Sequence, residues 1–129
     1  MYGFGTWLNL PFETVLERVT QALQAEGFGV LTDIDMQATM KAKLNADMQP
    51  YRILGACNPP MAHRALETDP EVGLLLPCNV VIRQLPDHRI HVSFMDPAAV
   101  LRLVNHPGID ELAGEVKTRL QRVCDSLTD

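Results

Sequence analysis

Apolar residues recur at every third or fourth position in two stretches, one near each end of the chain. The first stripe consists of Phe12, Val15, Leu16, Val19 and Leu23, and the second of Leu112, Val116, Leu120, Val123 and Leu127. This spacing gives an α-helix one apolar face, so we predict helices over residues 11–27 and from about residue 109. Pro11 suits the first turn of the first helix. Gly27 suits a left-handed residue at its end, which would let Phe28 fold back onto the last turn.

Shorter stretches alternate apolar and polar residues, the pattern of β-strands. It predicts strands over residues 2–10, 30–34, 51–57, 79–85 and 89–95. The last two strands flank Pro86-Asp87-His88, which predicts a hairpin. Four residues that can cap a helix predict short helices between and after the strands. These caps are Asp35, Asn58, Asp69 and Asp96.

The order of elements is not the strict strand–helix alternation of a parallel α/β fold. We therefore predict an α+β fold with one domain over residues 1–129. It would be a two-layer sandwich, with a mostly antiparallel sheet and the long helices on one face. The helix predicted after Asp35 carries Met36, Met40 and Leu44 on one face, and helical spacing predicts that Met36, Met40 and Met48 pack in the core.

Composition and charge narrow the classes of partner. The 129 residues include 11 basic and 16 acidic side chains, for a net charge of −5, and the arginines are scattered singly. Because nucleic-acid binding depends on clustered basic residues, we expect no nucleic-acid partner. The most apolar stretch, residues 72–81, is too short and too interrupted to cross a membrane. Three widely spaced cysteines form no disulfide framework, so we expect a reducing, cytoplasmic location without a signal peptide or membrane partner.

The stretch from Gly55 to Val81 holds the candidate chemistry. Cys57 ends a predicted strand directly before a helix N-terminus, where partial positive charge favours a thiolate. His63 lies in that helix and Cys78 opens the next strand. The hairpin then returns the chain to the same end of the sheet. We therefore expect Cys57, His63, Cys78 and Asp96 to converge there.

Three hypotheses for this cluster stay open. The first is a module that binds a small ligand or a partner, with an apolar cavity bordered by Asn58 and His63, and with Asn79 and Asp96 as further binding candidates. The second is redox or sulfur-transfer chemistry with Cys57 as nucleophile and Cys78 as resolving thiol. The third is a metal site made by Cys57, His63 and Cys78, although no metal-binding spacing or fourth ligand is present.

Purely structural roles would also explain the cysteines and the histidine on which these hypotheses depend. Unpaired cysteines are often buried as small apolar residues, and a lone histidine commonly caps or packs. The chain contains neither the GxSxG motif nor the HExxH motif. No specific catalytic signature is therefore present, and the sequence leaves the cofactor unknown.

Three segments carry a family resemblance: YRILGACNPP (51–60), AHRAL (62–66) and GLLLPCNVV (73–81). Together with GFG (3–5) and GFGVLTDID (27–35), they resemble the bacterial and archaeal family called domain of unknown function 302. The resemblance implies a two-layer sandwich of β-α-β-β-β-β-α type and a homodimer, and it brings no reaction, substrate or cofactor. The motif positions of the family fall here on Gly55, Cys57, Asn58, Pro59, His63, Pro77, Cys78 and Asn79.

Overall fold

Five strands form one antiparallel sheet in the computed structural model, which describes residues 1–129. The strands lie in the order β1-β5-β4-β3-β2. Their bounds are β1 Gly3–Leu8, β2 Gly29–Asp35, β3 Tyr51–Cys57, β4 Cys78–Gln84 and β5 Ile90–Met95. The first two strands of the chain therefore form the two edges of the sheet, and the hairpin of β4 and β5 lies inside it.

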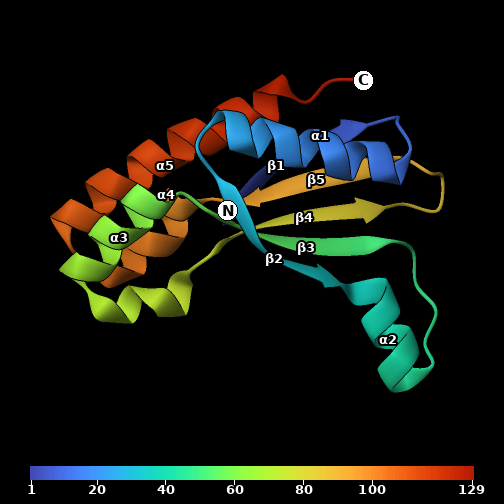
Figure 1. Ribbon diagram of the computed structural model, residues 1–129, viewed down its shortest axis with the longest axis horizontal. Coiled ribbons are helices and arrows are strands. Elements are labelled where there is room, and N and C mark those ends of the chain that lie inside the picture. Colours follow the sequence, from blue (N-terminus) through green and yellow to red (C-terminus); the bar gives the residue numbers. More distant parts are fainter.

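The two long helices cover one face of this sheet (Figure 1). The α-helices are α1 Phe12–Ala25, α2 Met36–Leu44, α3 Pro59–Thr68, α4 Pro97–Val100 and α5 Pro107–Ser126, and the 3₁₀ helices are η1 Pro70–Leu75 and η2 Leu101–Val104. Because α1 connects strands at opposite edges, it passes across the sheet, and α5 lies alongside it. Helices α3 and α4 gather at one end. The predicted α+β two-layer sandwich is confirmed. None of the helices combines the length and the apolar composition that crossing a membrane requires.

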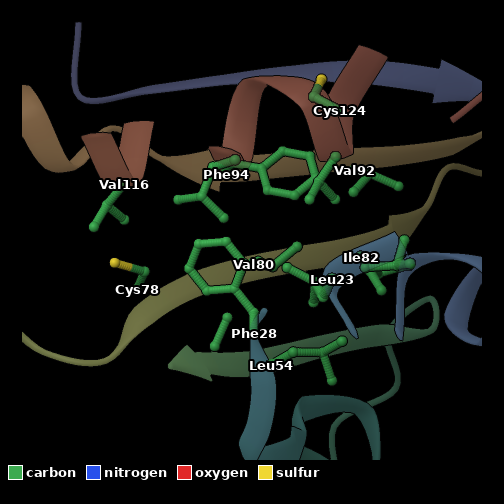
Figure 2. Close-up of a cluster of buried hydrophobic side chains, with 14 of the residues drawn as sticks. Leu23, Phe28, Leu54, Cys78, Val80, Ile82, Val92, Phe94, Val116 and Cys124 are labelled. Atoms are coloured by element: carbon green, nitrogen blue, oxygen red, sulfur yellow. The ribbon is translucent and has the colours of Figure 1, made fainter. Parts of the chain in front are cut away.

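The core lies between the sheet and the α1–α5 layer. Side chains from β4 and β5 alternate between this layer and the opposite face, which gives both strands a regular pattern of buried and partly buried residues. Val80, Ile82 and Val92 are fully buried and Phe94 nearly so. They belong to the same core cluster as Leu23 of α1 (Figure 2). All the buried hydrophobic residues form one cluster, so the fold has a single continuous core.

The ends of the two long helices follow the local sequence signals, but two predicted helix starts need correction. Gly27 has a φ of +85° and the Phe28 amide donates to the carbonyl of Leu23 at 2.9 Å, as predicted. Pro11, however, precedes the helix as its N-cap instead of occupying the first turn. The last helix begins at Pro107, two residues earlier than predicted, because the His106 side chain accepts a hydrogen bond from the Gly108 amide and caps it.

Helix α2 departs from the expected packing. Asp35 caps it as predicted, accepting a hydrogen bond from the Ala38 amide at 2.9 Å. None of its residues is buried, however, and the helix projects away from the two layers (Figure 1). Met48, which follows the helix, is also absent from the core. The prediction that Met36, Met40 and Met48 pack in the core is therefore wrong. Helical periodicity shows which face is apolar, but not whether another element of the chain covers that face.

Candidate functional site

A cavity of about 290 Å³ opens at the end of the sheet where β3 ends and β4 begins. Helices α3, η1 and α5 complete its walls. Thirteen of its sixteen lining residues are hydrophobic, and none is charged. Among the apolar ones are Phe28, Met61, Ala65, Leu101, Leu112 and Val116. A larger hollow between α1 and the β2–β3 edge is more open, and only three of its nine lining residues are hydrophobic. The apolar cavity is therefore the better candidate for a binding site.

The sequence after β3 builds one wall of this cavity. The Asn58 side chain accepts a hydrogen bond from the Met61 amide at 3.3 Å, which caps α3, and Pro59 and Pro60 occupy the first helical positions. Met61 and Ala65 are four residues apart and both are buried, so they lie on the same side of α3 and face the cavity. Asn58 is itself only 8% exposed and is the one amide side chain that lines the cavity.

Close contact between Gly55 and Pro77 shapes the wall near the strand ends. A Cβ atom at Gly55 would lie 2.7 Å from Cγ of Pro77 and would also collide with Oγ1 of Thr32. The proline, which follows a cis peptide bond, lines the cavity. A side chain at position 55 would therefore displace this part of the wall. This close contact explains why the motif position is occupied by glycine.

Both motif cysteines border the cavity, and neither forms a disulfide. Cys78 is 5% exposed and lies at the end of the core (Figure 2), whereas Cys57 is half-buried. Burial raises the pKa of both thiols, for Cys78 to about 12 with a smaller contribution from the charge of Cys57. The thiols are thus neutral near pH 7, and the expected lowering of the Cys57 pKa by the N-terminus of α3 is wrong. The structure gives no support to a reactive thiolate.

His63 points away from the cavity. Its side chain is 75% exposed, and Nδ1 lies 3.2 Å from Oε1 of Glu67 one turn later in α3. No group of three or more His, Cys, Asp or Glu side chains in the structure is arranged to hold a metal ion. The metal site predicted from Cys57, His63 and Cys78 is therefore not formed.

The strands converge as expected, but the polar side chains do not. Register aligns Val80 with Phe94, which brings the end of β5 beside the start of β4. The Asp96 carboxylate nevertheless accepts hydrogen bonds from two α4 amides and lies 2.9 Å from Nζ of Lys117. Burial acts to raise the pKa of Asp96, but these contacts outweigh it and hold the pKa below its usual value. Asn79 is exposed on the other face of the sheet.

Of the predicted site residues, only Cys57, Asn58 and Cys78 border the cavity. Most of the lining was not predicted from the sequence, because it comes from distant parts of the chain. Leu112 and Val116 belonged to the predicted core stripe of the last helix. A hydrophobic residue at the end of a core stripe gives no signal that it faces a cavity instead of another side chain.

Comparison with known proteins identifies the family. The chain belongs to the family described as "Domain of unknown function DUF302", which matches residues 5–127. The crystal structure of an uncharacterized conserved DUF302 protein from Bacillus stearothermophilus has a TM-score of 0.89 to this fold. The two sequences are 28% identical, and the match covers 97% of each chain. No curated protein matches the chain significantly. The resemblance noted in the sequence is thus confirmed, and these relatives carry no named activity.

Proposed function

We propose that this protein binds a small, neutral and mostly apolar molecule in the cavity between α3, η1, α5 and the sheet. The absence of charged residues from the lining carries the proposal. A charged ligand would lose its hydration there without gaining an ion pair. An apolar ligand would gain about 25 cal/mol for each Å² of surface removed from water.

The polar groups of the cavity fit the same ligand class. The two thiols are uncharged, and Asn58 offers an amide beside an otherwise apolar surface. Ligand pockets commonly combine an apolar lining with a few polar groups that orient the ligand. Leu31 and Leu66 line the cavity although they are 66% and 41% exposed. A bound molecule would shield these leucines from water and gain further apolar contact.

A cavity-filling variant tests the proposal. In Ala62→Leu, a larger side chain replaces a lining residue, and Ala25→Leu places the same change on the exposed end of α1. The probe is Nile red, a neutral apolar dye whose emission rises in apolar surroundings. We expect saturable binding to the unmodified protein and to Ala25→Leu, and at least about tenfold weaker binding to Ala62→Leu, a loss of about 1.4 kcal/mol. Equal binding by all three proteins would exclude the cavity as the site.

We also infer a homodimer that is formed through α2. An isolated helix shorter than about 12 residues is marginal in water, yet none of the nine residues of α2 is buried within the chain. Ile34 and Leu44 are 46% and 70% exposed in this region.

Light scattering tests the homodimer directly. We expect the mass of a dimer for the unmodified chain and of a monomer for Leu44→Lys. Leu103→Lys, which changes a leucine that is 77% exposed elsewhere on the molecule, should remain a dimer. A monomeric unmodified protein would refute the inference.

The three free thiols also lead us to infer a reducing, cytoplasmic location.

A further inference from the structure

The sheet face opposite α1 and α5 carries a row of aromatic and cationic side chains across four strands. Register pairs Trp7 of β1 with His91 of β5, His91 with Arg83 of β4, and Arg83 with Tyr51 of β3. These residues alternate with the buried core residues of their strands, so they lie on the face that the long helices leave uncovered (Figure 1). Trp7 is 46% exposed, and the other three are partly exposed.

Contacts at the β1–β5 end hold the aromatic rings in place. The ring centroids of Trp7 and His91 are 4.3 Å apart, and the Arg89 guanidinium lies 4.7 Å from the centroid of Trp7. A Cβ atom at Gly5 would come within 3.2 Å of the imidazole of His91, so the glycine leaves room for the ring. Nδ1 of His91 is buried without a hydrogen-bond partner.

The charge of this row is unbalanced. Arg89 pairs with Asp87 at 2.9 Å, but Arg83 takes part in none of the ion pairs or side-chain hydrogen bonds of the structure. Its positive charge acts on His91, whose pKa is lowered first by burial and then by Arg83. A free guanidinium beside aromatic rings favours an anion, because arginine binds carboxylates and phosphates bidentately and stacks on planar groups.

We propose that this row binds a small anion that carries an aromatic ring, with the ring against Trp7 and His91 and the anionic group at Arg83. A nucleoside monophosphate has this combination. A long polyanion fits less well, because the chain as a whole has a net charge of −5 and would repel it. A second copy of the chain also fits less well, since it would have to bury the Arg83 charge without a carboxylate partner from the row.

Tryptophan fluorescence reports on this site directly, because Trp7 is the only tryptophan in the chain. Titration of the protein with AMP should give a saturable change in its emission. Adenosine and inorganic phosphate, which each supply half of the ligand, should bind more weakly than AMP. Added salt should weaken AMP binding, because the Arg83 contact is electrostatic and partly exposed.

Substitution of Arg83 tests the anion contact. Arg83→Gln should weaken AMP binding about tenfold or more, since a hydrogen bond to a charged group is lost. Arg102→Gln, which removes an exposed arginine from η2, should bind AMP like the unmodified protein. Circular dichroism of both variants establishes that they are folded. Ala62→Leu, which fills the apolar cavity, should leave AMP binding unchanged, so the two binding sites are tested separately.

Several results would overturn the proposal. One is the absence of a fluorescence response to AMP, and another is an equal affinity of Arg83→Gln and the unmodified protein in folded samples. Much tighter binding of an adenine oligonucleotide than of AMP would identify a surface for single-stranded nucleic acid instead. Trp7 emission that changes with protein concentration, without any response to AMP, would show that a second copy covers this face.

Discussion

Replacement of Gly55 by alanine tests how tightly the cavity wall is packed. The added Cβ atom would lie 2.7 Å from Cγ of Pro77, whereas ordinary contact begins at 3.4 Å, and it would also collide with Oγ1 of Thr32. The proline ring and the β2 side chain must therefore both move. Since Pro77 lines the cavity, the same displacement should change the shape of the binding site.

The expected cost of Gly55→Ala combines two opposing effects. Overpacking of a close-packed site costs about 1–3 kcal/mol. Replacing glycine also restricts the conformations of the unfolded chain, which stabilises the folded protein by about 0.4–1 kcal/mol. The net loss of stability is about 1–2 kcal/mol. Gly29→Ala is the matched control, because Gly29 also lies in a strand and no atom lies within 4 Å of the added Cβ.

Urea denaturation of the two variants measures the difference. A difference of about 2 kcal/mol corresponds to denaturation midpoints about 1 M apart, because the slope for a small domain is roughly 1–3 kcal/mol per M. Gly55→Ala should also bind Nile red more weakly, whereas Gly29→Ala should not. Equal midpoints for the two variants would contradict this prediction, because they would show that the Gly55–Pro77 contact is not tight.

Three further predictions follow from burial and capping. Cys78→Ser should cost about 1–3 kcal/mol in urea denaturation, because it buries a hydroxyl at an apolar position, and Cys57→Ser should cost less. Asn58→Ala should lower the denaturation midpoint by the cost of a lost helix cap, about 1 kcal/mol, and retention of full stability would contradict the cap. The pKa of Asp96 is lowered by Lys117 and the α4 amides, so its stabilising effect is present above the unfolded pKa of about 3.9 and disappears as the pH falls through the lower folded value. Asp96→Asn should therefore reduce the fall of the melting temperature in acid, and an unchanged acid profile would contradict this.

Local signals in the sequence predicted most of the fold. The apolar stripes, the helix caps and the hairpin turn act through neighbouring residues, so they can be recognised without knowing the tertiary structure. Gly27 and Phe28 illustrate this, because a left-handed residue and the next amide end the helix within a few residues. Whether a partner covers an apolar face is not a local property, and this is why the packing of α2 was wrongly predicted.

The candidate site was predicted less well, because its side chains depend on rotation about a helix and on competing partners. His63 lies two residues after Met61, whose side chain is buried, and a separation of two residues puts it on another side of α3. The sequence did contain a signal that Asp96 caps a helix and therefore does not belong to the site. Asp96-Pro97 was recognised as a helix start, and the capping carboxylate is therefore occupied by α4 amides.

The most direct test of the ligand-binding cavity is the alkylation rate of Cys57 with and without saturating Nile red. Cys57 lines the cavity and is half-buried, whereas the buried Cys124 lies outside the cavity and serves as the internal control. We expect the dye to slow the alkylation of Cys57 and to leave that of Cys124 unchanged, as measured by mass spectrometry of the separate peptides. Alkylation of Cys57 at the same rate with the dye bound would contradict the claim that the cavity is the binding site.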